Sequence, residues 1–560
     1  FAIFQAKRGA LGASADAAGA YFDILLRRIG SDPKTNAADA ERFFASSEAL
    51  VGESTAAAAL QFAERLSSEG TASAGISRAR DATLRLVSQK DQEIRQLQRA
   101  GAYVGDVRTT LAGELDALRK QANELEQRLF EANPRYATAL STSVTSKDLQ
   151  SELKDGEGYL KVMLLSNRGY GVLITNREVR PYAIELTRAK ARELAAKLRE
   201  PFSEVSSGLL GQWDVGIAHD LYKSLFGPVQ AQMTGIHRLV YQPDPTMVGV
   251  PIGALVTDAA GLGTMAGNVE SARQARKEVS YKGVSWLASR LETSVSVSTA
   301  AFWNTRRSRP SRALKPFLGF ADPVISNGAE AFPSVVAPDW SIKVAGGIDF
   351  CTNYRQQLMR LPQLPEAATE VRFVAKAVGA PESVIVGADF TDDRIKNGGG
   401  FEGALDQYRI LYFATHGLLP QANGCFQPSL VTSQGGAQSD SLLDANEIPG
   451  LQLDADLVVL SACDTGAGLD EGGGGAALGG LVSTFTYAGA RNLLVSNWEV
   501  DSAATEILMS SLFNSKAATQ GEALSEAERS FIARDDDYSH PYYWAAFLIV
   551  GDGARALPRS

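Results

Sequence analysis

Along the first 133 residues, apolar positions recur every three to four residues, which is the spacing of one face of an α-helix. Stretches such as "AAAALQFAERL" and "LAGELDALRKQANELEQRLF" combine this spacing with residues that favour helices, mainly Ala, Leu, Glu, Arg and Gln. We therefore predict an all-helical region. Residues 1–70 are expected to form helix pairs without a clean repeat period, and residues 71–133 a long antiparallel helical hairpin that turns near "RAGAYVGDV".

The hydrophobic pattern changes after residue 154. "GYLKVMLLSNRGYGVLITN" holds two β-rich runs around Asn167, Arg168 and Gly169, which predicts a hairpin. Farther on, apolar runs of a few residues, such as "RILYFATHG" and "LVVLSACDTG", alternate with helical segments. Strands that are apolar on both sides are buried on both faces, so we predict a mostly parallel α/β sheet flanked by helices.

This α/β region divides at a basic, proline-containing segment, "NTRRSRPSRALK", which covers residues 304–315. We interpret that segment as a linker between two pseudo-equivalent halves, residues 155–303 and 316–556. A chain of 560 residues with 45% hydrophobic positions is also too long for one core, which agrees with several units.

Composition narrows the classes of partner and compartment. The net charge of −9 argues against nucleic-acid binding, which needs a basic face, and no apolar run reaches the roughly 18 residues of a membrane span. Three cysteines, Cys351, Cys425 and Cys463, are too few and too scattered for a disulfide framework, so we expect a cytoplasmic protein. Because the chain begins with Phe1, we interpret it as a fragment or a processed chain, and a removed signal peptide stays open.

Two polar residues follow predicted strands at the same relative place. His416 ends "RILYFATHG", and Cys463 stands near the end of "LVVLSACDTG". Ligands bind beyond the carboxyl ends of strands in open α/β sheets, so neighbouring strands would bring imidazole and thiol together. The imidazole would activate the thiol and protonate the leaving amine, and the main-chain amides of Gly417 and Cys463 would form an oxyanion hole. No side chain is evident that orients His416, and a backbone carbonyl would suffice.

Either residue alone is more often a packed residue than a catalytic one. Together they are stronger evidence, because their separation of 47 positions is close to the roughly 50 expected between His and Cys in caspases. A phosphate-binding reading of the glycine run Gly472–Gly475 fails because no Lys-Ser/Thr follows. A zinc site fails because the His and Cys residues form no close pair. We expect no cofactor and no metal.

The motifs "YFATHG", "VVLSACDTGAG", "STFTYAGARNLLVSNWEVD" and "HPYYWAAFLIVGD" resemble the CHAT family of caspase-like cysteine peptidases, which are related to separase and often follow tetratricopeptide-like helical repeats. The resemblance implies that His416 and Cys463 are the catalytic pair. It also implies that Asp464, Glu499 and Asp501 bind a basic residue before the scissile bond, Arg in preference to Lys. The segment "DEGGGGAALGG" departs from the family in its long glycine run.

The predicted function is therefore that of a cysteine endopeptidase acting on a protein substrate and regulated by a protein partner at the N-terminal helices. Three alternatives stay open. The chain could be a catalytically silent binding scaffold of the same family. The acids Glu499 and Asp501 could cap the following helix. The arginines Arg306, Arg307, Arg309 and Arg312 could form an exposed loop that the enzyme cleaves in itself, or a solvated linker.

Overall fold

The fold is given by a computed structural model. It describes residues 15–31, 36–48, 105–132, 144–202, 210–325, 361–398, 404–418, 428–435, 439–445, 447–462, 474–498 and 501–559, with single positions between 76 and 97. Among the helices within these ranges, none combines the length and the apolar character needed to cross a lipid bilayer.

An eleven-stranded sheet runs through the described part of the α/β region, in the order β3-β2-β1-β4-β5-β14-β13-β12-β8-β6-β7. Its strands are β1 (Glu157–Leu164), β2 (Gly169–Thr175), β3 (Val179–Ile184), β4 (Arg238–Gln242), β5 (Glu292–Val295), β6 (Lys315–Ala321), β7 (Val384–Val386), β8 (Tyr408–Ala414), β12 (Ala455–Ser461), β13 (Ala490–Ser496) and β14 (Phe547–Val550). The pairs β1–β2, β2–β3 and β13–β14 are antiparallel, and the other neighbours are parallel. The predicted mostly parallel sheet is confirmed.

The predicted hairpin is the β1–β2 pair. Met163 lies opposite Tyr170, and the Leu165 N–H donates to the Arg168 carbonyl at 3.0 Å to close the turn. A second, smaller sheet consists of β9 (Gly417–Leu418), β10 (Ser429–Val431) and β11 (Leu442–Asp444), in the order β11-β10-β9. It starts directly after β8, and so it lies at the carboxyl edge of the large sheet.

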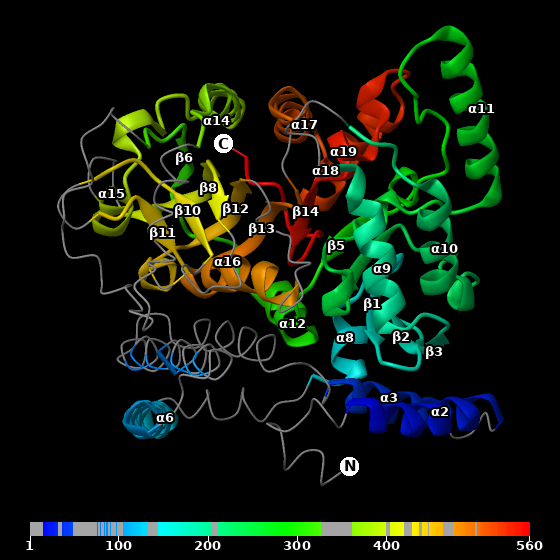
Figure 1. The fold of residues 1–560 in the computed structure, drawn as a ribbon, viewed down its shortest axis with the longest axis horizontal. Coiled ribbons are helices and arrows are strands. Elements are labelled where there is room, and N and C mark those ends of the chain that lie inside the picture. The colour runs from blue at the N-terminus through cyan, green and yellow to red at the C-terminus, as the bar shows by residue number, and fades with distance from the viewer. Residues whose placement is uncertain are drawn as a thin grey trace.

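Helices cover both faces of the sheet, as Figure 1 shows for α14 and α17 on one side and α16 on the other. The α-helices that the structure describes in this region are α8 (Ser146–Glu152), α9 (Arg188–Arg199), α10 (Val215–Phe226), α11 (Ala259–Ala275), α12 (Thr299–Arg307), α14 (Pro365–Ala377), α15 (Asp392–Asn397), α16 (Gly474–Ala488), α17 (Ser502–Asn514), α18 (Gln520–Ile532) and α19 (Pro541–Trp544). Successive residues of a strand point to opposite faces. In β8, Tyr412 belongs to the core under α14 and α17, whereas Leu411 and Phe413 belong to the core over α16.

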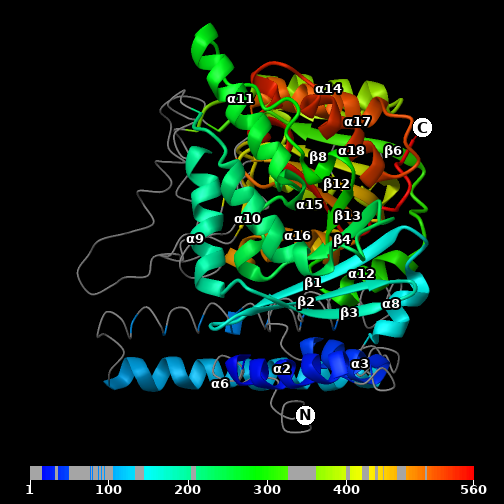
Figure 2. The same cartoon turned by 90° about the vertical axis from the view of Figure 1, so that its right-hand side faces the viewer.

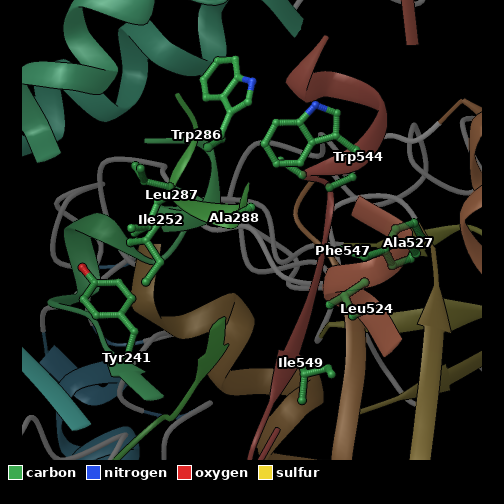
Figure 3. Close-up of a cluster of buried hydrophobic side chains, with 14 of the residues drawn as sticks. Tyr241, Ile252, Trp286, Leu287, Ala288, Leu524, Ala527, Trp544, Phe547 and Ile549 are labelled. Atoms are coloured by element: carbon green, nitrogen blue, oxygen red, sulfur yellow. The ribbon is translucent and has the colours of Figure 1, made fainter. Parts of the chain in front are cut away.

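The first of these cores extends across both halves of the α/β region. Figure 3 shows Trp286 from the first half facing Trp544 from the second, and the two rings meet edge to face with centroids 5.6 Å apart. Ile549 of β14 lies in the same core. Because β14 also pairs with β5, the two halves share one sheet and one core.

The N-terminal helices pack on the β1–β3 end of the sheet (Figure 2). Phe22 of α2 (Ala15–Ser31) contacts Phe43 of α3 (Asn36–Glu48) and Tyr170 of β2, with ring centroids 4.5 and 5.1 Å apart. In α6 (Gly105–Ala132), Leu111 and Leu115 pack against Ile94, Val87 and Leu97. These contacts place the described positions around residue 90 against α6, and the hairpin expected for residues 71–133 stays a prediction. The segment 49–75 lies outside the described residues.

The basic segment 304–315 begins within a helix. α12 continues to Arg307, and Ser308 follows as its C-cap. The Arg306 side chain is only 9% exposed and forms ion pairs with Glu157 at 2.8 Å and Asp552 at 2.7 Å. The hypothesis of an exposed arginine loop is therefore wrong at Arg306, because its charge is neutralised inside the fold.

Candidate active site

His416 follows β8 at the carboxyl edge of the sheet. β8 and β12 are adjacent parallel strands whose register pairs Ala414 with Ser461, and the Thr415 N–H donates to the Ser461 carbonyl at 3.2 Å. His416 stands two residues after Ala414 in the chain, and Cys463 stands two residues after Ser461. Cys463 itself lies outside the described residues, so the structure places only one member of the predicted pair. The two strands that carry the pair are neighbours, as the prediction requires.

The His416 imidazole is buried and fixed by a backbone carbonyl. Its Nε2 lies 2.8 Å from the carbonyl oxygen of Pro362. A carbonyl can only accept, so Nε2 carries the proton of the neutral ring and Nδ1 keeps the lone pair. The arrangement supplies the orienting group for which the sequence offered no side chain, and it leaves Nδ1 as the basic nitrogen.

The main-chain amide of Gly417 is directed away from the small sheet. Gly417 pairs with Leu430 in β10, and the Val431 N–H donates to the His416 carbonyl at 2.9 Å. In an antiparallel ladder this makes Gly417 and Leu430 a non-hydrogen-bonded pair. The Gly417 N–H is therefore not used by the β9–β10 ladder, which leaves it free to act as a donor at the carboxyl edge.

A buried carboxyl lies beneath the strands that lead to the site. Glu370 of α14 accepts a hydrogen bond from the Tyr412 hydroxyl of β8 and bonds the Ser461 hydroxyl of β12. Burial raises the pKa of Glu370 to about 7, although these two hydrogen bonds act in the opposite direction. Glu370 thus ties β8 to β12 from one face. Glu370 is not among the predicted site residues, and its one signal in the sequence is a Glu on the apolar face of α14, next to Val371 and Val374.

Asn497 is a second residue that the sequence analysis missed. It follows β13, the other neighbour of β12, and the Ser496 hydroxyl beside it donates to the carbonyl of Ala462. The Asn497 side chain is fully buried, and neither atom of its amide has a hydrogen-bond partner among the described residues. Unpaired buried amides are rare because they lose their hydrogen bonds to water without replacement. This one stands at the same edge of the sheet as His416.

Of the three predicted specificity residues, the structure describes Asp501 only. Asp464 and Glu499 lie outside the described residues. Asp501 is the N-cap of α17, and its Oδ1 accepts from the Ala504 N–H at 2.8 Å. The alternative that Asp501 caps the following helix is therefore correct. The cap occupies one carboxylate oxygen, so it does not remove the second oxygen or the charge.

The other histidines make structural contacts. His219 Nδ1 lies 2.9 Å from the Val256 carbonyl. His540 caps α19, and burial lowers its pKa to about 3. Among the described residues, Asp392, Asp440 and Glu447 form a carboxylate group that could hold a metal ion, but the Lys396 ammonium already bonds Asp392 at 2.8 Å and Glu447 at 2.6 Å.

The α/β region matches a known family over most of its length. The family model described as "CHAT domain" matches residues 216–552, which is more than half of the chain. The chain belongs to the CHAT family. The resemblance inferred from the sequence motifs is thereby confirmed, and the match includes both His416 and Cys463.

Individual relatives are more distant. The human protein Tetratricopeptide repeat protein 28 is 26% identical over 229 residues, which cover 34% of this chain and 9% of that protein. The separase of the Saccharomyces cerevisiae separase–securin complex is 10% identical, with a TM-score of 0.36, and the match covers 80% of this chain and 34% of that one. Gingipain R, an Arg-specific cysteine proteinase, is 10% identical, with a TM-score of 0.32 and coverage of 66% and 75%. The CHAT chain thus spans about a third of the separase chain.

Proposed function

We propose that this CHAT protein is a cysteine endopeptidase in which Cys463 is the nucleophile and His416 the general base and acid. One observation carries the proposal. β8 and β12 are parallel neighbours in register, and His416 and Cys463 each stand two residues beyond the paired residues Ala414 and Ser461. Parallel strands in register bring equivalent positions to the same edge of the sheet.

The chemistry follows from the state of the imidazole. With its Nε2 proton bonded to Pro362, His416 can take the thiol proton of Cys463 on Nδ1. The thiolate sulfur then attacks the amide carbon, and the Gly417 N–H stabilises the oxyanion that forms. His416 returns the proton to the leaving amine, which leaves an acyl-thioester on Cys463. Water then attacks this thioester, with His416 again as the base; the carbon–sulfur bond breaks, the acid product leaves, and the sulfur of Cys463 recovers the proton from His416.

Covalent labelling tests this assignment. A peptide chloromethylketone that ends in Arg should add once to the wild-type chain, as read by intact-mass spectrometry, and should not add to the Cys463→Ala variant. His416→Ala should slow the labelling by roughly 10²–10⁴-fold, because it removes the base. A Cys351→Ala/Cys425→Ala variant is the matched control and should be labelled like wild type. Labelling that persists in Cys463→Ala would contradict the proposed nucleophile.

We further propose that Asp464, Glu499 and Asp501 favour Arg before the scissile bond. A carboxylate pairs with a guanidinium through two parallel hydrogen bonds, which an ammonium cannot match. Asp501 supports this proposal because its capping contact uses Oδ1 alone. A chloromethylketone ending in Arg should therefore label faster than its Lys counterpart, and far faster than one ending in Leu.

The N-terminal helices are the proposed docking place of a regulatory protein. Phe22 and Phe43 are buried against β2. Tyr21 and Ile24 of α2, in contrast, are 38% and 49% exposed and stand three positions apart on one helix. Residues at this spacing share a helix face. A Cys463→Ala variant used as bait should retain bound substrates and partners, and adding Tyr21→Glu/Ile24→Glu to it should release the partners alone.

If no chloromethylketone labelled the chain, with or without a partner, the chain would be the catalytically silent scaffold.

A further inference from the structure

The amino-terminal edge of the sheet, opposite to His416, holds a cavity of about 420 Å³. Arg409, in β8, and Asp456, in β12, stand at the start of these strands, and Lys154 precedes β1. His416 follows Arg409 by seven residues, which corresponds to roughly 20 Å along an extended chain. The C-terminal segment after β14 forms another wall, which includes Arg559. The cavity is therefore separate from the candidate active site.

The lining of the cavity is strongly cationic. Its basic residues are Lys154, Arg306, Arg409, Arg555 and Arg559, and its acidic residues are Asp456 and Asp552. Both acids are already neutralised by guanidinium groups. Asp552 pairs with Arg306 at 2.7 Å, and Asp456 pairs with Arg555 at 3.4 Å and with Arg491 at 3.8 Å.

In the described part of the chain, three of the cations have no carboxylate partner, Lys154, Arg409 and Arg559, although Arg559 donates to the carbonyls of Ser515 and Ala517. Arg409 is the most informative of them. Its Nη2 donates to the Arg559 carbonyl at 2.6 Å, but its buried Nε has no acceptor. A buried guanidinium donor without an acceptor is unfavourable, so this side chain of the cavity wall lacks an anionic partner.

Arg555, in the same wall, lies close enough to the Arg491 guanidinium to be affected by its charge. Burial lowers the pKa of Arg555 from its ordinary value, the Asp456 and Asp552 carboxylates act in the opposite direction, and the Arg491 guanidinium lowers the pKa. A bound anion would relieve the repulsion between the two guanidinium groups.

We propose that the cavity binds a small polyanion that carries at least two phosphate groups. Three cations that lack a carboxylate partner in the described part of the chain favour an occupant with more than one negative charge, and phosphate oxygens match the forked donors of arginine. A volume of about 420 Å³ lies in the range of small-molecule sites, and the net charge of −9 disfavours a nucleic acid strand as the occupant.

The cavity also joins the two halves of the α/β region: Lys154 stands directly before the first half and Arg306 directly after it in α12, whereas Arg409 belongs to the second half and Arg559 follows it. An occupant would hold these elements together. The polyanion should therefore raise the melting temperature of the chain as well as bind to it.

Isothermal titration of the full chain with inorganic tripolyphosphate tests the proposal. Wild type should bind it at one saturable site with a rise in Tm, and sulfate at the same ionic strength should not. Arg409→Gln should weaken the binding at least tenfold. Lys154→Gln/Arg559→Gln should do the same; both side chains are exposed, so this variant decides the question if Arg409→Gln does not fold. The control Arg180→Gln removes the same charge from an exposed position of β3 and should bind within twofold of wild type. Absence of saturable binding, or equal binding by wild type and both cavity variants, would overturn the proposal.

Discussion

The buried carboxyl of Glu370 makes the stability of this CHAT protein depend on pH. Its pKa is about 7 in the folded chain, against an ordinary value of 4.5, because burial disfavours the charged form. The protonated carboxyl therefore stabilises the fold. This contribution is complete below about pH 4.5 and is lost as the pH rises through 7. At about 1.4 kcal/mol for each unit of pKa, it amounts to roughly 3 kcal/mol.

Replacing Glu370 with Gln should remove this dependence. Gln keeps an oxygen that accepts from the Tyr412 hydroxyl, but it carries no charge. We expect Glu370→Gln to exceed wild type in free energy of unfolding by up to roughly 3 kcal/mol at pH 8, and to match it near pH 4.5. Urea denaturation across this range measures the difference. Glu366→Gln, on the exposed side of the same helix, is the control and should follow wild type; a Glu370→Gln curve parallel to wild type would show that Glu370 is charged in the fold.

At the scale of elements, Asp501 separates the role of a helix cap from that of a specificity residue. Asp501→Asn keeps the oxygen that caps α17 and removes the charge, whereas Asp501→Ala removes both. We expect Asp501→Ala to cost about 1 kcal/mol in the free energy of unfolding and Asp501→Asn much less. If Asp501 binds Arg, both variants should lose at least tenfold of the preference for an Arg over a Leu chloromethylketone.

Asp258, the N-cap of α11, provides a matched control for the cap. Its side chain accepts from the Gly261 N–H at 2.9 Å, in the same arrangement as Asp501. Asp258→Asn should change neither stability nor reagent preference. If Asp501→Asn kept the preference for the Arg over the Leu chloromethylketone, Asp501 would be a helix cap only, and the specificity would have to come from Glu499 or Asp464.

The helices and strands also show which features of the fold and of the candidate site can be predicted from the sequence. The apolar runs of β8 and β12 identified strands buried on both faces, and the change of residue type after each run marked His416 and Cys463. The order of strands that makes β8 and β12 neighbours depends on long-range packing and was an assumption. The sequence could not predict that the Pro362 carbonyl bonds His416, because a backbone acceptor has no residue-specific pattern. The basic residues and Pro310 predict a linker at residues 304–315, whereas the structure continues α12 to Arg307; the signal for this helix is Ser298, a good N-cap.

For the whole molecule, Arg306 joins parts of the fold that are far apart in sequence. Its guanidinium bonds Glu157 of β1, Asp552 after β14 and the carbonyl of Glu152 in α8. Burial alone would raise the pKa of Glu157, but the hydrogen bond and charge of Arg306 hold it below its usual value. Both carboxylates are nearly inaccessible; Glu157 also pairs with Arg238 at 3.1 Å, whereas Arg306 is the ion-pair partner of Asp552 among the described residues.

Arg306→Met should therefore destabilise the whole α/β region, and not only α12. Removing Arg306 leaves the buried Asp552 without its ion-pair partner, and breaking a buried pair costs about 3–5 kcal/mol. The adjacent residue gives a sharp comparison, because Arg307 is 54% exposed and its pair with Glu152 is a surface contact worth at most about 1 kcal/mol. Urea unfolding followed by tryptophan fluorescence, which reports on Trp286 and Trp544 in the shared core, measures both variants. If Arg306→Met and Arg307→Met unfolded at the same midpoint, the network would not be what holds the two halves together, and the shared core around these tryptophans would have to do so alone.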